Sequence, residues 1–174
     1  ILSVPDAGFF VGERECVSEL LNIGEKYITV CLGGDDLIWR FGEESKCKNF
    51  ICFLSSLLNG FLDTHNEYKI VFVAHIFDDY QIINEVIKRM CEKYKRLNVV
   101  CSSWGPSESN FFSSIMSLYK NAVFSLSMRY HSSICPISMK VPTIGLSTED
   151  RICDLFEAIG ARENCVDLRK DGYE

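Results

Sequence analysis

The sequence predicts an α/β domain in which a doubly wound parallel sheet of about six strands carries helices on both faces. Short apolar and β-branched runs alternate along the chain with longer segments whose apolar residues recur at helical spacing. The strand-like runs are apolar on both faces, as expected for a parallel sheet buried between two helix layers. The 174 residues suit one domain, and a hydrophobic content of 47% can fill its core. We therefore expect residues 26–174 to form one Rossmann-like domain, preceded by a linker at residues 1–25.

Six runs have the composition of buried strands, and turn-forming residues bound several of them. They cover residues 26–34, 68–76, 98–102, 122–128, 141–147 and 165–168. The first run ends on a glycine pair, and the third is followed by the turn sequence Ser-Trp-Gly-Pro. Because helical segments separate the runs, neighbouring strands should be parallel and their crossovers right-handed.

Five helical segments connect these strands. They cover residues 43–65, 78–97, 107–120, 131–140 and 148–160. The first is apolar on most of its surface, so we expect it to be well buried. The second is amphipathic over its whole length, with Asp78 or Asp79 as its N-cap. Pro136 interrupts the fourth, because proline suits only a first turn or a kink. The fifth should begin with Thr148 as N-cap and end with Gly160 as C-cap.

The composition argues against several classes of protein. The net charge of −6 is unfavourable for a nucleic-acid binder. Basic residues do cluster at positions 88–96, but Glu85 and Glu92 lie among them, which indicates a solvated helix face. No apolar run approaches the roughly 18 residues that span a bilayer, and no secretory signal is visible. The nine cysteines show neither a Cys-x-x-Cys pair nor zinc-ligand spacing, so we interpret them as free thiols in a reducing compartment.

The ligand site is expected where the parallel strands end, because open α/β sheets bind ligands beyond the carboxyl ends of their strands. Five loops occupy such positions. They contain Gly33, Gly34 and Asp35; His75, Asp78 and Asp79; residues 102–105; Arg129 and His131; and residues 147–151. These loops are rich in polar residues and glycines, so the sequence predicts which edge of the sheet carries the site.

Arg129 and His131 are the strongest candidates, because they end one predicted strand and open the next predicted helix. Arginine offers a planar, permanently charged fork that suits carboxylate and phosphate groups. Histidine titrates near neutral pH and can act as an acid or as an anion donor. Ser132 and Ser133 add hydroxyl donors beside the N–H groups at the helix start, where anions bind. The alternative is that Arg129 pairs with a nearby carboxylate and that His131 is an ordinary helix residue.

Further candidates follow the first two predicted strands. His75 could hydrogen-bond a substrate or only cap the next helix, and the same two roles are open to Asp78 and Asp79. These three residues lack a recognised metal-binding spacing, so we predict no metal site. Gly33 and Gly34 lack the Gly-x-Gly-x-x-Gly spacing of a dinucleotide site, but they would let a ligand or a facing domain approach the backbone.

Residues 121–160 carry a resemblance to a known family. They read NAVFSLSMRYHSSICPISMKVPTIGLSTEDRICDLFEAIG. This segment resembles the polysaccharide pyruvyl transferases in its strand, its Met-Arg-x-His motif, its small-residue helix and its Val-Pro strand. Two shorter segments are also similar to that family. They read VAHIFDDYQIINEV, with a His and an Asp pair after a strand, and PDAGFF near the start.

The resemblance implies a fold, a reaction and a set of partners. Members resemble GT-B glycosyltransferases, in which two Rossmann-like domains face each other, so this chain would be the C-terminal domain. Because the chain starts at Ile1 and not at Met, we expect an N-terminal domain of the same protein to be missing. The family transfers the enolpyruvyl unit of phosphoenolpyruvate to a sugar of a cell-surface polysaccharide or lipid-linked precursor, forming a pyruvate ketal. The resemblance implies a cytoplasmic location, or one at the inner face of the membrane, and no cofactor or metal.

The resemblance also implies which residues hold phosphoenolpyruvate. They are Arg129, His131, Ser132, Ser133, Arg151, Gly33 and Gly34. Among these, Arg129 and His131 would be catalytic, and His131 is the better candidate for the acid or the phosphate partner. Relatives often have a lysine where this chain has Arg151, and a basic residue where it has Gly33 and Gly34; Arg40 could replace the latter.

Two other functions remain open. A C-terminal domain of a GT-B glycosyltransferase would bind the diphosphate of a nucleotide sugar at the same helix start, with Glu149 or Asp150 on the ribose. A non-catalytic binding module is the third hypothesis, and the isolated domain should be inactive in any case. The acceptor sugar and the oligomeric state do not follow from the sequence.

Overall fold

The computed structural model describes residues 25–35, 43–101 and 111–170, together with Asp6, Gly8 and Phe41. Its elements, in chain order, are β1 (Lys26–Cys31), α2 (Glu44–Thr64), β2 (Tyr68–Phe72), α3 (Phe77–Arg89), α4 (Glu92–Leu97), β3 (Val99–Cys101), α5 (Phe111–Lys120), β4 (Ser125–Ser127), α6 (Tyr130–Ser138), β5 (Thr143–Ser147), α7 (Asp150–Ala158), the 3-10 helix η2 (Arg162–Asn164) and β6 (Cys165–Asp167). Strands and helices alternate almost throughout, as predicted.

The six strands form one sheet in the order β3-β2-β1-β4-β5-β6, and all five neighbouring pairs are parallel. The chain builds outward from β1 to β3 and then returns to add β4, β5 and β6 on the other side. The strand order therefore reverses between β1 and β4, where Thr29 pairs with Ser125. In doubly wound sheets a ligand site lies at this switch point. The predicted fold class, a doubly wound parallel sheet with helices on both faces, is confirmed.

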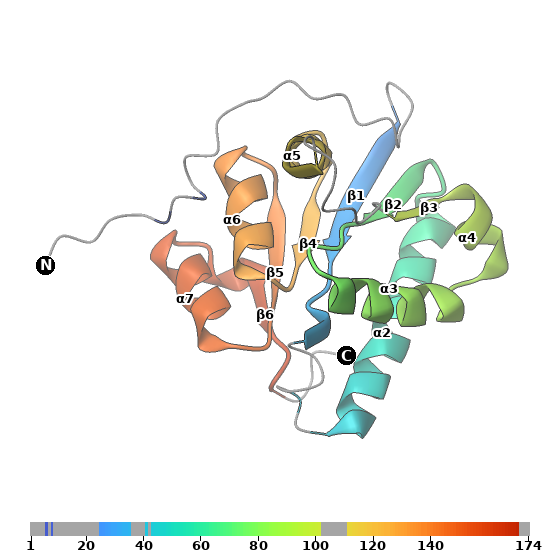
Figure 1. The fold of residues 1–174 in the computed structure, drawn as a ribbon, viewed down its shortest axis with the longest axis horizontal. Helices are drawn as coiled ribbons and strands as arrows, with labels where there is room; N and C mark the ends of the chain where they lie inside the picture. Colours follow the sequence, from blue (N-terminus) through green and yellow to red (C-terminus); the bar gives the residue numbers. More distant parts are fainter. Residues whose placement is uncertain are drawn as a thin grey trace, which may run out of the picture.

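Helices cover both faces of the sheet (Figure 1). On one face, α2, α3 and α4 pack on the strands through a large apolar core that includes Phe50, Leu54, Ile83 and Phe72. On the other face, α5 and α6 enclose a smaller core around Tyr119, and α7 packs against β5 and β6. The central strands are buried on both faces, which agrees with their continuous apolar sequence.

Two helices differ from their predicted form. The helix expected at residues 43–65 was to be buried on most of its surface, but Leu57 of α2 is 49% exposed, so only one face of α2 is buried. The helix expected at residues 78–97 is two helices, because α3 ends at Arg89 and Met90 and Cys91 are extended before α4 begins. The apolar stripe continues across the break, since Met90 and Tyr94 are both buried. Its continuity explains why the sequence reads as one helix.

The predicted helix ends also need correction. The N-cap of α3 is Ile76, and Asp79 is instead the third helical residue. The N-cap of α7 is Glu149 and not Thr148. Ile159 is the C-cap of α7, and Gly160 follows it in the left-handed conformation, with φ of 72°. This position favours glycine, so the helix ends where the sequence predicted but with its cap one residue earlier.

The interrupted helix is the remaining difference in secondary structure. Pro136 was expected to interrupt the helix at residues 131–140, but α6 runs through it and ends two residues later, at Ser138.

Three predictions lie outside the described residues. They are the turn at residues 102–105, the helix start at residue 107, and Arg40. The linker proposed at residues 1–25 is described only at Asp6, Gly8 and Glu25, so the domain boundary stays a prediction.

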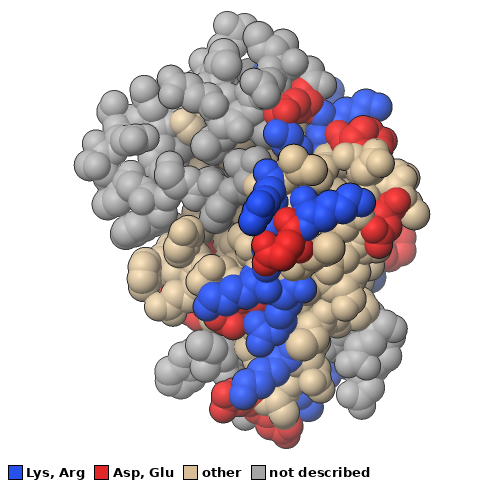
Figure 2. Space-filling view, turned by 90° about the vertical axis from the view of Figure 1, so that its right-hand side faces the viewer, with Lys and Arg blue, Asp and Glu red and all other residues tan. Residues whose placement is uncertain are grey.

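The surface over α3 and α4 mixes charges of both signs (Figure 2). Lys88 and Arg89 pair with Glu85, and Lys95 pairs with Glu92, at distances of 2.7–2.9 Å. Three of the five basic residues of this region are thus paired within their own helices, which agrees with the solvated helix face that the sequence indicated. None of the helices in the described part of the chain is long and apolar enough to cross a membrane.

Candidate functional site

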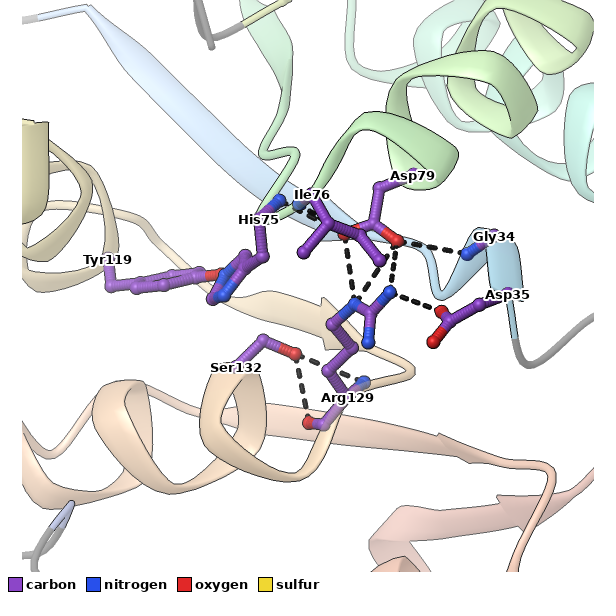
Figure 3. A network of polar contacts seen from close by, with 8 residues as sticks. All are labelled: Gly34, Asp35, His75, Ile76, Asp79, Tyr119, Arg129 and Ser132. Carbon is purple, nitrogen blue, oxygen red and sulfur yellow. Dashed lines mark hydrogen bonds and ion pairs between the residues drawn. The ribbon is translucent and has the colours of Figure 1, made fainter. Parts of the chain in front are cut away.

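The switch point of the sheet brings the ends of β1, β2 and β4 together around Arg129 (Figure 3). Arg129 follows β4 and is the N-cap of α6. Asp79 lies in the first turn of α3, and Asp35 follows the end of β1. The side chains of both carboxylates reach the guanidinium of Arg129. Residues that lie 44 to 94 positions apart in the chain therefore form one polar network.

Asp79 is the centre of this network and is completely buried. The Nε of Arg129 donates to both carboxylate oxygens, at 3.1 and 2.9 Å, and its Nη2 also donates to Asp79. Three backbone N–H groups complete the set, from Gly34 at 2.9 Å, His75 at 3.0 Å and Ile76 at 3.2 Å. A buried carboxylate is costly unless it is paired and hydrogen-bonded, and Asp79 is both. It joins β1, β2, α3 and α6 at the switch point.

Arg129 is largely enclosed by these contacts. Burial by itself lowers its pKa, but the hydrogen bonds and negative charge of Asp79, with the charge of Asp35, outweigh burial and raise the pKa above its usual value. The pairing that we gave as the alternative for Arg129 is therefore present. One end of the guanidinium stays available, since its Nη1 has no hydrogen-bond partner among the described residues and Arg129 still lines a pocket.

Gly34 has a structural role in this arrangement. A Cβ atom at Gly34 would lie 2.0 Å from the carbonyl oxygen of Asp78, which no side chain could tolerate. Its N–H group is already bonded to Asp79. Gly33 is buried beside it. The glycine pair thus allows the N-terminal turn of α3 to pack against the end of β1, and it is this facing backbone, not a ligand, that approaches Gly34.

The hydroxyls of Ser132 and Ser133 form hydrogen bonds within the protein. Both are completely buried. The Ser132 hydroxyl donates to the carbonyl of Arg129 at 2.9 Å and accepts the N–H group of Arg129 at 3.2 Å. The Ser133 hydroxyl donates to the same carbonyl at 3.0 Å. The predicted contact of their hydroxyls with a donor substrate has no support in this geometry, because both hydroxyls hold the first turn of α6.

His75 lies between the network and the second layer of helices. Its Nε2 is 2.7 Å from the hydroxyl of the buried Tyr119 on α5. Burial is the main reason that the pKa of His75 falls to about 4, so the imidazole is neutral at pH 7. Tyr119 was not singled out in the sequence, where it is indistinguishable from the other apolar residues of its helix.

The remaining candidates are exposed. The ring of His131 is 61% exposed, and its Nε2 lies 3.5 Å from Asp6. The guanidinium of Arg151 lies 3.8 Å above the ring of Tyr130. Among the described residues, no carboxylate forms an ion pair with Arg151. The stacked guanidinium keeps its N–H donors for a ligand, since stacking uses only the face of the group.

A pocket of about 370 Å³ opens between these groups. It is lined by Asp35, His75, Arg129, Tyr130, His131, Glu149 and Arg151. The structure thus brings together four residues of the predicted set at the pocket: His75, Arg129, His131 and Arg151. The pocket lining does not include Gly33, Gly34, Ser132 or Ser133. Tyr130 could have been suspected from its place inside the Met-Arg-x-His motif. Asp78 is exposed and does not line the pocket.

The pocket is polar and contains groups suited to an anion. Two arginines line it, and two carboxylates, Asp35 and Glu149, stand beside them, so it is not simply a basic pocket. The first turn of α6, whose residues Tyr130 and His131 line the pocket, presents the positive end of a helix dipole. No cluster of three or more potential metal ligands occurs among the described residues.

Comparisons with known proteins place these residues in a family. A search of curated proteins found no significant match. Among solved structures, a mutant O-GlcNAc transferase from Thermobaculum terrenum is similar at 10% identity and a TM-score of 0.43, over 82% of this chain and 26% of that protein. This chain thus spans about a quarter of that protein's length. The polysaccharide pyruvyl transferase family matches residues 54–150, which is more than half of the chain and contains His75, Arg129 and His131. The chain belongs to the polysaccharide pyruvyl transferase family.

Proposed function

We propose that this domain binds phosphoenolpyruvate and supports transfer of its enolpyruvyl unit to a sugar of a cell-surface polysaccharide or of its precursor. The observation that carries the proposal is the pocket at the sheet's switch point, where His131 and Arg151 are exposed beside the start of α6. Both residues lie in or directly beside the segment that matches the family. The reaction would take place in the cytoplasm or at the inner face of the membrane.

The chemistry of the donor fits the groups in the pocket. Phosphoenolpyruvate carries a phosphate and a carboxylate, and charge-assisted hydrogen bonds from arginine and histidine bind such groups well. Arg151 can present its edge to one anionic group, because its face rests on Tyr130. Nη1 of Arg129 can reach the other without breaking the pairs with Asp79 and Asp35. Arg129 would then serve mainly to hold the pocket together and secondarily to contact the donor.

The transfer needs a proton and a leaving group. One proton adds to the methylene carbon of the donor, two sugar hydroxyls bond to the neighbouring carbon and lose their protons, and phosphate leaves. His131 is the best placed group to give a proton or to bind the departing phosphate, because it is exposed in the pocket and within reach of solvent. His75 is neutral at pH 7, so it suits a hydrogen bond or a base and not an acid. No step requires a metal or a cofactor.

A second function is favoured by one feature of the pocket. Glu149 lines it next to Arg151, where a carboxylate could bind the ribose of a nucleotide sugar. The domain would then bind a nucleotide sugar as part of a GT-B glycosyltransferase. In either case a second domain of the same protein would form the facing wall of the cleft. A binding module without catalysis is the third candidate.

Titration of the full-length protein separates these functions. Isothermal titration with phosphoenolpyruvate and with UDP- and GDP-sugars should show binding of phosphoenolpyruvate. His131→Ala and Arg151→Ala should each weaken this binding about tenfold, the loss of one charge-assisted hydrogen bond. Arg96→Ala removes an exposed cation at the far end of α4 and should leave it unchanged. Binding of nucleotide sugars alone would refute the proposal, and phosphoenolpyruvate binding without transfer to any glycan would favour the binding module.

A further inference from the structure

An exposed face of α3 beside the pocket has an unusual composition. Phe77 is 55% exposed and Tyr80 is 45% exposed, although both are large aromatic residues. Gln81 and Asn84 are exposed on the same helix. At 3.6 residues per turn, these four positions lie within about 100° of one another around the helix axis. They form one continuous face, here called the aromatic–amide face, over the first two turns of α3.

The rest of α3 shows that this face is not an ordinary solvated surface. The buried side of the helix carries Ile82, Ile83 and Val86, as an amphipathic helix requires. The last turns carry Glu85, Lys88 and Arg89, which form ion pairs with one another. The four positions of the aromatic–amide face, by contrast, carry no charge, and the exposed Asp78 lies at the side of this face. Exposed aromatic residues that are grouped on one face mark binding sites more often than single exposed residues do.

The helix that carries this face begins beside the pocket. α3 begins two residues after His75, which lines the pocket. Asp79, in the first turn of α3, binds Arg129, which also lines the pocket. The start of the helix is therefore fixed against the pocket by buried hydrogen bonds. A ligand lying along the first two turns of α3, a length of about 10 Å, would have one end at the pocket.

We propose that Phe77, Tyr80, Gln81 and Asn84 bind the saccharide acceptor. Sugar rings have faces of C–H groups, which lie well against the flat faces of aromatic side chains. Their hydroxyls both donate and accept hydrogen bonds, which matches the side-chain amides of Gln81 and Asn84. A charged face would suit a phosphate or a peptide better than a neutral sugar. The inference rests on the proposed function only in taking the acceptor to be a saccharide, and it does not depend on the identity of the donor.

The competing occupant is another protein surface. Phe77 and Tyr80 together with Ile76, which is 38% exposed, could be covered by a second domain. That contact would favour apolar residues throughout, and the two amides would be of little use in it. A saccharide uses both the rings and the amides. The two occupants therefore predict different effects of removing an amide, and the experiment is built on this difference.

The test measures saccharide binding by the full-length protein. Lactose, cellobiose, maltose and chitobiose serve as neutral probes in NMR titrations, and we expect at least one to bind in the millimolar range. Phe77→Ala and Tyr80→Ala should each weaken that binding about tenfold, Asn84→Ala about threefold, and Phe77→Tyr, which keeps the ring, by less than about twofold. Leu97→Ala, which changes a residue 67% exposed at the distant end of α4, should have no effect.

Several results would overturn the inference. They include failure of all four disaccharides to bind, and binding that Phe77→Ala and Tyr80→Ala leave unchanged. A fall in the melting temperature of the full-length protein on Phe77→Ala, with saccharide binding intact, would assign the face to a domain contact. Phosphoenolpyruvate is titrated in parallel. If phosphoenolpyruvate fails to bind while Phe77→Ala still weakens the saccharide, the donor proposal falls and this one stands.

Discussion

The carboxyl edge of the sheet has two halves with similar polar composition and opposite accessibility. In the closed half, at the ends of β1 and β2, Gly34, His75 and Asp79 are bonded to one another or to Arg129 and Tyr119. In the open half, at the ends of β4 and β5, His131 and Arg151 are exposed in the pocket. Position at the ligand edge therefore does not identify a ligand group. Substitutions in the closed half should lower the free energy of unfolding. Substitutions in the open half should weaken ligand binding.

The largest effect is expected from Asp79→Ala. The change would leave the largely enclosed guanidinium of Arg129 without its main partner and three backbone N–H groups without an acceptor. Breaking such a buried pair costs about 3–5 kcal/mol of the free energy of unfolding. Urea denaturation would measure it, with Asp78→Ala as the control, because Asp78 is the exposed neighbour in the same helical turn. Equal losses in the two variants would show that Asp79 is not the centre of the network.

The pH dependence of stability should reveal His75. Its pKa is about 4 in the folded protein, mainly because of burial, against an ordinary value of 6.5. Between these values the unfolded chain binds a proton that the folded chain does not, so stability falls as the pH drops from about 6.5 to about 4. The loss reaches about 3 kcal/mol at the low end and is absent above pH 7.

Comparison of variants isolates this contribution. His75→Asn cannot take up the proton, so the part of the acid destabilisation that belongs to His75 should disappear between pH 7 and pH 4. His65→Asn, at an exposed histidine, should keep the wild-type profile. Denaturation midpoints measured at pH 4, 5, 6 and 7 give both profiles. Parallel curves for wild type and His75→Asn would mean that His75 is accessible to protons in the folded state and belongs to the open half.

The glycines provide a third comparison. Gly34→Ala places a methyl group against the backbone carbonyl of Asp78, and backbone cannot move aside as a side chain can, so we expect a loss of about 1–3 kcal/mol or more. Gly60→Ala in α2 is the matched control, since a Cβ there would have no atom within 4 Å. Alanine should stabilise that helix by about 0.5–1 kcal/mol. Thermal unfolding measures both, and a neutral Gly34→Ala would show that β1 and α3 are packed less closely than here.

The sequence predicts the sheet and its ligand edge because both depend on local patterns. Runs that are apolar on both faces predict a parallel sheet, and the strand ends then follow. The helix break at Met90 was missed because the apolar stripe continues through it. Asp79 is not the N-cap that was predicted, but its carboxylate does accept hydrogen bonds from backbone N–H groups at the start of α3.

The sequence could not predict which polar groups pair with one another inside the protein and are therefore not available to a ligand. The pairing of Arg129 with Asp79 joins residues 50 positions apart, and that of Arg129 with Asp35 joins residues 94 positions apart. Such contacts depend on the order of the strands, which one sequence does not contain. The Met-Arg-x-His motif therefore contains residues that line the pocket, while only the fold separates Arg129, which is paired with carboxylates, from His131, which is exposed.

The smallest effect concerns the stacking contact that orients Arg151 in the open half. The guanidinium of Arg151 lies over the ring of Tyr130, and an exposed pair of this kind contributes about 0.5–1 kcal/mol. A double-mutant cycle with Arg151→Ala and Tyr130→Leu should therefore give a coupling of that size in stability. The same cycle measured on phosphoenolpyruvate affinity should give a larger coupling, because the ring fixes the direction in which Arg151 presents its donors. A coupling in stability alone would mean that Arg151 belongs with the groups that hold the fold, and that the pocket relies on His131 and the start of α6 for its anion.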